Sequence, residues 1–339
     1  VSRESGERQG AVWQRQRRQQ QRIRQSRFAP HGYKMTRLNF KGMMAPTFAP
    51  FKADGSLNLE MVKPYAAHLK KQGVTGVWVN GSVGEGLSMT VAERKAVAEA
   101  WLACRDDVPT VIVHCGAVCL KDVQEMACHA ESHGASAVAV LPNVYERPAT
   151  TDQLVDYMQE VAKACPRTPL FYYHIPMKTC VNLSMSEFLA KGVKRVPTLA
   201  GIKFTDMDVS GEGRKCLAVD SSLTIFSGFD ESLQEALSVG FTACVNSSGN
   251  FVPQLGSRIF SLMAAGDADG AKKVQDQLLD CLAIIFAESG GFNGAGLKAA
   301  CTILTGLQLG PTRLPVQMLT QDRMNTVRKN LGSRGFKVY

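Results

Sequence analysis

The sequence lacks three features that would place it in a special class of protein. It has no apolar run that approaches the roughly 20 residues needed by a bilayer-spanning helix. Its ten cysteines stand singly without any Cys-x-x-Cys pair, and the closest two are Cys115 and Cys119. This spacing suits neither a disulfide framework nor a zinc site. We therefore expect no membrane partner and a cytoplasmic location, in which thiols stay reduced.

Most of the chain also lacks net charge. The 339 residues carry a formal net charge of +9, but residues 1–34 hold nine Lys or Arg against two Glu. That segment accounts for +7, which leaves +2 for the other 305 residues. The basic character belongs to the tail, so we predict no nucleic-acid partner for the folded part.

Residues 1–34 are expected to form a disordered basic tail, because an Arg- and Gln-rich composition buries too little apolar surface to offset chain entropy. Three interpretations stay open: a mitochondrial transit segment, a basic arm for nucleic acid, or translated upstream sequence, which includes residues encoded by an expression vector. The last is favoured, since Met35 stands immediately before the first segment with a structured pattern.

From residue 40 onward, short apolar runs alternate with longer amphipathic segments. Strands are expected at 42–47, 76–80, 110–115, 137–141, 169–173, 199–203, 223–227 and 243–247. Helices are expected at 58–72, 90–104, 121–133, 151–165, 184–191, 209–219, 231–239 and 253–265, and then at 268–288, 294–305 and 316–331. Eight uniformly apolar strands that alternate with helices predict a closed (β/α)8 TIM barrel rather than a doubly wound sheet. Residues 35–339 are thus expected to be a single barrel with C-terminal helices from about residue 268.

Residues with suitable chemistry follow the ends of three predicted strands. Lys203 ends an apolar run, where desolvation would free a neutral amine for attack on a carbonyl. Tyr173 ends the preceding strand and would carry protons. The glycines of the Gly81–Glu85 loop would let backbone amides converge on a carboxylate. Together these residues predict a site for a 2-oxo acid, although each alone is also compatible with a solvent-facing lysine, an interfacial tyrosine or an ordinary turn.

The motifs GSVGE, FYYHIP, GIKFTD and GPTRLP, in this order, resemble the dihydrodipicolinate synthase/N-acetylneuraminate lyase family from about residue 40 to at least 315. They are most similar to the animal N-acetylneuraminate lyases within it. The resemblance implies that Lys203 forms a Schiff base with pyruvate and that Tyr173, hydrogen-bonded to Ser82, transfers protons. It implies that Ser82 and Val83 hold the pyruvate carboxylate.

The same resemblance implies a sugar-binding side and an assembly. Positions matching those that bind the polyhydroxylated part of the substrate are Thr205, Gly228, Asp230, Glu231 and Ser247. Tyr145 resembles a tyrosine that reaches into a neighbouring subunit's site, and a homotetramer is implied. The expected reaction is reversible cleavage of N-acetylneuraminate (sialic acid) to N-acetylmannosamine and pyruvate by a class I aldolase. No cofactor is expected, because the imine withdraws the electrons.

The sequence departs from the family pattern at three positions, and two other functions remain open. The family normally has Thr at Val83, a glycine at Asn246 and an aromatic residue at Gly249, which leaves the pocket's efficiency and preference unsettled. Another pyruvate-dependent aldolase, such as one acting on 4-hydroxy-2-oxoglutarate, would share the lysine and tyrosine. A catalytically weakened sialic-acid-binding relative would also fit the sequence.

Two side-chain pairs have alternative interpretations. Asp230 and Glu231 would, in the simpler reading, only cap the helix that starts at Ser232. His129 and His133 lie one helical turn apart, as a metal-binding pair would. No third ligand with suitable spacing accompanies them in the sequence. We therefore expect a solvated helix face there and no metal.

Overall fold

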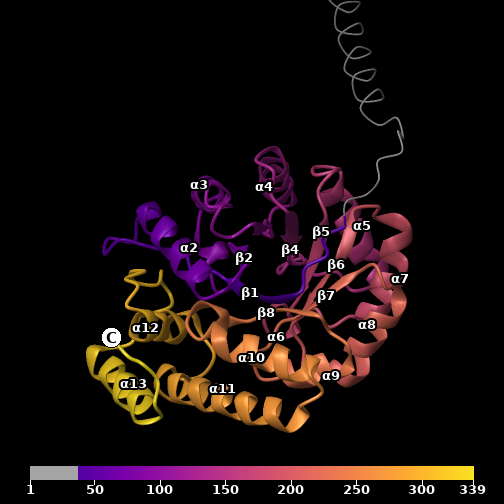
Figure 1. Ribbon diagram of the computed structural model, residues 1–339. Coiled ribbons are helices and arrows are strands. Elements are labelled where there is room, and N and C mark those ends of the chain that lie inside the picture. The colour runs from indigo at the N-terminus through magenta and orange to yellow at the C-terminus, as the bar shows by residue number, and fades with distance from the viewer. Residues whose placement is uncertain (1–36) are drawn as a thin grey trace, which may run out of the picture. The chain divides into compact units, whose positions relative to one another are not determined.

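The computed structural model describes residues 37–339, so the predictions for residues 1–34 lie outside the described part. Eight parallel strands close into a barrel in chain order, with β1 paired to β8 (Figure 1). The strands are β1 (Gly42–Pro46), β2 (Gly76–Val79), β3 (Thr110–His114), β4 (Ala137–Val140), β5 (Leu170–His174), β6 (Leu199–Phe204), β7 (Thr224–Ser227) and β8 (Ala243–Val245). The predicted TIM barrel is confirmed, and each strand lies within two residues of its expected bounds.

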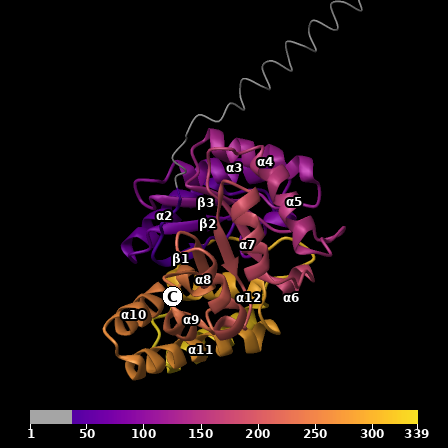
Figure 2. The ribbon, with the colours of Figure 1, turned by 90° about the vertical axis from the view of Figure 1, so that its right-hand side faces the viewer.

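Helices follow the strands and surround the barrel (Figures 1 and 2). They are α2 (Val62–Lys71), α3 (Val91–Leu102), α4 (Leu120–Ser132), α5 (Thr151–Ala162), α6 (Pro176–Thr179), α7 (Met185–Arg195), α8 (Arg214–Val219), α9 (Leu233–Val239) and α10 (Pro253–Ala264). The C-terminal helices are α11 (Ala268–Ser289), α12 (Gly294–Thr305) and α13 (Gln321–Ser333). Shorter helical turns are η1 (Leu59–Met61), η2 (Gly86–Ser88), η3 (Val209–Gly213) and η4 (Ser247–Asn250). Within residues 37–339, no helix has the length and apolar character to cross a membrane.

The ends of the helices follow local chemistry. Thr90 and Glu93 form a complete capping box at the start of α3. At α7 a similar box is half formed: Ser184 accepts a hydrogen bond from the Glu187 amide, but the Glu187 carboxylate pairs with Lys191 at 2.8 Å. The left-handed Gly240 ends α9.

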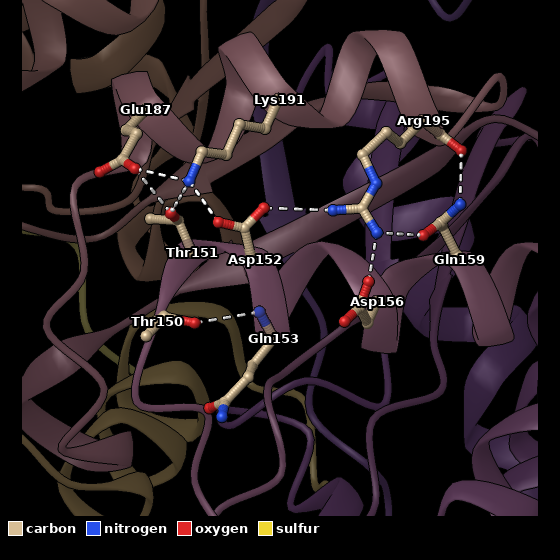
Figure 3. Close-up of polar contacts among 9 residues, drawn as sticks. All are labelled: Thr150, Thr151, Asp152, Gln153, Asp156, Gln159, Glu187, Lys191 and Arg195. Atoms are coloured by element: carbon tan, nitrogen blue, oxygen red, sulfur yellow. Dashed lines mark hydrogen bonds and ion pairs between the residues drawn. The ribbon is translucent and has the colours of Figure 1, made fainter.

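A network of charged side chains joins α5 to α7 on the outer ring (Figure 3). The Lys191 ammonium lies 2.6 Å from Asp152 Oδ2, and the Arg195 guanidinium lies 3.2 Å from Asp152 Oδ1. These side chains are largely solvent-accessible, so screening keeps the contribution of each pair small. The network orients two neighbouring helices and takes no part in the barrel interior.

Two layers of apolar side chains form the core. One fills the barrel interior and includes the large buried rings of Trp78, Phe171 and Phe226. The other lies between the strands and the surrounding helices. This division follows from the alternation of side chains along each strand, which sends successive residues to opposite faces. The interior layer makes the barrel a packed core on which a site can be built.

The Asn250 side chain makes three hydrogen bonds, of which one joins η4 to β1, one joins it to α2 and one lies within η4. Its side-chain amide donates to the carbonyls of Pro46 and Ser247, at 2.9 and 3.0 Å, and its Oδ1 accepts from the Tyr65 hydroxyl at 2.6 Å. The side chain is completely buried, so these groups have no alternative partner in solvent. Asn250 therefore fixes the turn that carries Ser247 and Ser248.

Replacing Asn250 with Ala is expected to lower the free energy of unfolding by about 2–4 kcal/mol, because three buried groups lose their partner. The variant Tyr65→Phe, which removes only one of these bonds, is expected to cost about 1 kcal/mol. Urea denaturation of the two variants checks the difference. Equal losses in the two variants would contradict the attachment role of Asn250.

Candidate active site

Lys203 and Tyr173 meet at the carboxyl ends of β5 and β6. The register pairs the two residues directly, and Lys203 Nζ lies 3.4 Å from the Tyr173 hydroxyl. Their exposures are 4 % and 3 %, so both polar groups lie in a nearly dry setting. The structure thus brings together the two residues that the sequence proposed as nucleophile and proton carrier.

A one-residue irregularity in β6 creates this pairing. Leu170 pairs with Leu199, but Phe171 pairs with Gly201, so Ala200 is an extra residue in the ladder. Without it, Tyr173 would face Ile202, and Lys203 would lie opposite the next residue of β5. Since side chains alternate between the two faces of a strand, a one-residue slip reverses the face of each. The bulge therefore places Lys203 on the same face as Tyr173.

Aromatic rings surround the lysine ammonium. Nζ lies 4.4 Å from the centroid of the Tyr173 ring and 5.5 Å from that of Trp78, which packs edge-on against Tyr173. Aromatic faces attract a cation without neutralising it. The ring of His114 also packs edge-on against Tyr173, with centroids 5.9 Å apart. These walls stabilise positive charge at Nζ while they exclude water.

His114 is held as a neutral imidazole. Its Nδ1 lies 3.0 Å from the carbonyl of Asn80, which can only accept, so this nitrogen carries the proton. Burial and the neighbouring Arg94 guanidinium hold the pKa of His114 well below its usual range. The other nitrogen, Nε2, remains an acceptor beside Tyr173.

The Gly81–Glu85 loop forms one wall of a cavity of about 230 Å³, to which Ser82 and His114 contribute. A Cβ on Gly84 would lie 2.7 Å from the carbonyl oxygen of Thr47, so only glycine allows this close approach. Val83 is buried. The expected hydrogen bond between Tyr173 and Ser82 is absent among the described residues, where the Tyr173 hydroxyl is bonded to Lys203 instead.

The residues expected on the sugar side gather after β6, β7 and β8. Thr205 and Gly228 are in contact, since a Cβ on Gly228 would lie 2.0 Å from Thr205 Oγ1. Ser247 begins η4. Asp230 is buried, and its carboxylate accepts hydrogen bonds from the Ser248 amide, at 3.3 Å, and hydroxyl. Sequence spacing gave no signal for this role of Ser248.

Asp230 and Glu231 differ in their surroundings. Burial raises the pKa of Asp230 to about 7 and also raises the pKa of Glu231. Neither carboxylate accepts a hydrogen bond from the first turn of α9 within residues 37–339, and the N-cap Ser232 makes no side-chain cap bond. The pair thus makes no capping hydrogen bond to α9 within the described residues, and Asp230 is bonded to Ser248 instead.

Eight buried polar atoms near the carboxyl ends of the strands have no hydrogen-bond partner within the described chain. They are Thr47 Oγ1, Trp78 Nε1, Asn80 Oδ1, His114 Nε2, His174 Nδ1, Thr205 Oγ1, Ser227 Oγ and Asn246 Oδ1. Buried polar groups are normally paired, so an unpaired set at one end of a barrel indicates a place for a polar molecule. The sequence motifs gave no signal for Thr47, Trp78 and Ser227, although Thr47 follows β1 directly and Ser227 ends β7.

The other positions singled out from the sequence are Tyr145, Asn246 and Gly249. Tyr145 follows β4 and is 79 % exposed, away from the Lys203 side chain's dry setting. Asn246 donates a hydrogen bond to the carbonyl of Phe229 at 3.1 Å. Gly249 packs against β1, where a Cβ would lie 3.3 Å from Ala45 Cα. An aromatic side chain at this position would need a different backbone path.

The histidine pair on α4 has a third neighbour that the sequence did not reveal. Ligand atoms of Glu99, His129 and His133 lie within 4.8 Å of one another. The expectation that no third ligand accompanies the pair was therefore wrong, because Glu99 comes from α3. Within the protein, His129 Nε2 already pairs with Glu99 at 2.8 Å, and His133 Nδ1 donates to the His129 carbonyl at 2.9 Å. The cluster lies on the outer helices.

The fold and the Lys203–Tyr173 pair define a TIM-barrel protein with a buried amine at the carboxyl ends of its strands. Comparison with known proteins gives the family. Residues 39–333 match the dihydrodipicolinate synthetase family, and the chain belongs to that family.

Similar relatives are N-acetylneuraminate lyases. The human lyase is 35 % identical over 303 residues, which cover 87 % of this chain and 93 % of the relative. The lyase of Xenopus tropicalis is 34 % identical and covers 86 % and 95 %. The native sialic acid aldolase structure from Aliivibrio salmonicida has 32 % identity and a TM-score of 0.83, covering 89 % of this chain and 99 % of that one. A catalytic-lysine mutant of the Ruminococcus gnavus aldolase has 27 % identity and a TM-score of 0.81, covering 87 % and 96 %.

Asp230 is expected to make stability depend on pH. Its pKa is about 7 in the folded chain and near 3.8 when unfolded, so the folded state binds the extra proton between these values. Stability therefore falls as pH rises from about 4 to 7, by at most about 1.4 kcal/mol per pH unit.

The variant Asp230→Asn removes this group and is expected to flatten that part of the stability profile. Urea denaturation at several pH values from 4.5 to 7.5 measures the slope. An unchanged slope in the variant would show that other groups cause it.

Proposed function

We propose that the chain is a class I aldolase that reversibly cleaves N-acetylneuraminate to N-acetylmannosamine and pyruvate. The observation that carries this proposal is the dry contact between the Lys203 ammonium and the Tyr173 hydroxyl. The amine can form an imine with the carbonyl group of a substrate. The phenol beside it can move the protons that this step requires. The similarity to N-acetylneuraminate lyases supports this choice of substrate.

Lys203 is proposed as the nucleophile. Its neutral amine attacks the C2 carbonyl of the open-chain sugar acid, and loss of water gives the protonated imine. The C3–C4 bond then breaks, its electron pair moves to the imine to form an enamine, and the C4 carbon leaves as the aldehyde of N-acetylmannosamine. Protonation at C3 and hydrolysis release pyruvate and restore Lys203. The rings of Trp78 and Tyr173 favour the cationic imine.

Tyr173 is proposed to relay protons. Its hydroxyl takes the proton that leaves the C4 hydroxyl and returns one to the enamine carbon. Ser82, in the wall of the adjacent cavity, would complete the relay after substrate displaces the present bond between Lys203 and Tyr173. The backbone amides of Ser82 and Val83, with the Ser82 hydroxyl, would hold the pyruvate carboxylate.

The sugar portion is proposed to lie over the ends of β6 to β8. Thr205 and Ser247 offer hydroxyl groups, and Glu231 has a partly buried carboxylate without a hydrogen-bond partner among the described side chains. Gly228 has no side chain, which lets the Thr205 hydroxyl lie close against its backbone. Asp230 is hydrogen-bonded to Ser248 and so stabilises this wall. It can bind the substrate only if that hydrogen bond breaks. An acidic wall favours a polyhydroxylated substrate over a dicarboxylate.

We also propose a homotetramer in a reducing, cytoplasmic setting. Tyr145 is exposed and so is accessible to a neighbouring subunit. All ten cysteines are free thiols, which supports a reducing compartment. No cofactor takes part in the proposed reaction.

Borohydride trapping with pyruvate is expected to reduce the imine to a stable adduct on Lys203, identified by peptide mapping. The variant Lys203→Met is expected to give no adduct, and Tyr173→Phe to slow cleavage of N-acetylneuraminate by about 10²–10⁴-fold. Release of pyruvate from N-acetylneuraminate is compared with release from 4-hydroxy-2-oxoglutarate. A folded wild-type protein without an adduct at Lys203 would refute the mechanism, and preference for the second substrate would refute the substrate assignment.

Replacing Val83 with Thr is expected to strengthen pyruvate binding by roughly tenfold, because the new hydroxyl can donate to a charged carboxylate. Val83→Ala, which adds no donor, is the matched control. The pyruvate concentration that gives half-maximal trapping measures the effect. If both variants bind pyruvate alike, the carboxylate does not lie beside residue 83.

A further inference from the structure

Four charged side chains from separate parts of the chain meet beside the Gly81–Glu85 loop. They are Glu85, Glu93, Lys298 and Arg313, and we call them the loop anchor. Lys298 on α12 lies 3.2 Å from Glu85 Oε1, and Arg313 Nη1 lies 2.8 Å from Glu93 Oε2. The two cations balance the two carboxylates. The mechanism proposed above uses none of these side chains.

Lys298 has no capacity left for a ligand. Its side chain is completely buried, and its three N–H groups are used by Ala49 O at 2.9 Å, Pro311 O at 2.7 Å and Glu85 Oε1. A buried ammonium persists only when it is paired and fully hydrogen-bonded, as here. Lys298 therefore acts on the neighbouring chain segments and not on a substrate.

Glu85 connects these segments to the loop. Its second oxygen, Oε2, accepts a hydrogen bond from the Arg313 amide at 2.7 Å. The Glu85 backbone has a left-handed φ of 52°, which a non-glycine residue adopts at a cost. Both carboxylate oxygens have hydrogen-bond partners, Lys298 and the Arg313 amide. These bonds stabilise the left-handed backbone conformation of Glu85, which is unfavourable on its own.

Arg313 fixes the segment that supplies Pro311 O and its own amide. Its guanidinium donates to Gly55 O at 2.8 and 3.1 Å and to Ser88 O at 2.9 Å, in addition to Glu93. Both Lys298 Nζ and Arg313 Cζ also lie over the Phe51 ring, at 4.6 and 4.5 Å from its centroid. The anchor thus joins the loops after β1 and β2 to the C-terminal helices.

We propose that Lys298 and Arg313 are positioning residues that hold the Gly81–Glu85 loop, through Glu85, in the conformation that binds the pyruvate carboxylate. This inference rests on the proposed function. Backbone amides bind an anion only when they converge on one point, so a small displacement of the loop weakens binding. Loss of the anchor should therefore weaken pyruvate binding while Lys203 and Tyr173 keep their contact.

Arg313→Met is the first test, and Arg334→Met is its matched control, since Arg334 pairs with Asp280 on exposed C-terminal helices. The measurement is borohydride trapping over a range of pyruvate concentrations, below the unfolding temperature of every variant. Arg313→Met is expected to raise the half-saturating pyruvate concentration about tenfold or more. The maximal trapping rate should change by less than about threefold. Arg334→Met should leave both values unchanged.

Lys298 is tested by a single and a double variant. Lys298→Met leaves Glu85 buried without its cation, which endangers folding. The double variant Glu85→Met, Lys298→Met removes both charges and avoids that penalty, yet it also removes the link to the loop. A raised half-saturating pyruvate concentration in the folded double variant supports the positioning role.

A purely structural role predicts a lower thermal midpoint with an unchanged half-saturating pyruvate concentration. That result in Arg313→Met and in the double variant would overturn the inference. Failure of the proposed function is distinguishable, because the unsubstituted protein would then form no adduct at Lys203.

Discussion

The barrel mouth depends on how β5 pairs with β6. The extra residue Ala200 shifts the ladder by one position, so that Tyr173 faces Lys203 instead of Ile202. Gly201 accommodates this shift with a positive φ of 146°, and a Cβ there would lie 1.9 Å from Thr224 O. A side chain at residue 201 would therefore clash with the backbone of β7. The chemical pair exists because a glycine permits the bulge two residues before the lysine.

Two buried lysines show how surroundings decide what an amine can do. Lys298 has three oxygen partners, one of them a carboxylate, which occupy all of its N–H groups, while burial lowers the pKa of this lysine. Lys203 has a single hydrogen-bond partner, the neutral Tyr173 hydroxyl, and no carboxylate within 4.0 Å in the described chain. Aromatic faces attract the charge of Lys203 but accept no proton from it. Under the proposed function, the same residue type thus serves as a reactive group at one site and as a fixed connection at the other.

The sequence was enough to predict the architecture, because alternating strands and helices have one common parallel arrangement of eight. It also placed Lys203, Tyr173 and Ser82 at strand ends. It did not reveal the Ala200 bulge, since register depends on contacts between strands, nor the four-residue α6, which is too short for a periodic pattern. Glu99 beside His129, and Ser248 on Asp230, come from separate elements. Spacing along one chain segment cannot detect such partners.

The departures from the family pattern differ in consequence. Gly249 packs its backbone closely on β1, so this change is absorbed by local packing. Asn246 donates a hydrogen bond to Phe229 O, but its Oδ1 has no partner within the described chain. Val83 is different, because a buried isopropyl group offers no hydrogen bond to an anion. Under the proposed function, carboxylate binding then depends more on backbone amides, whose strength comes from their convergence. The conformation of this loop is held by Glu85, so a chain with Val83 depends more strongly on its loop anchor than one with a second hydroxyl.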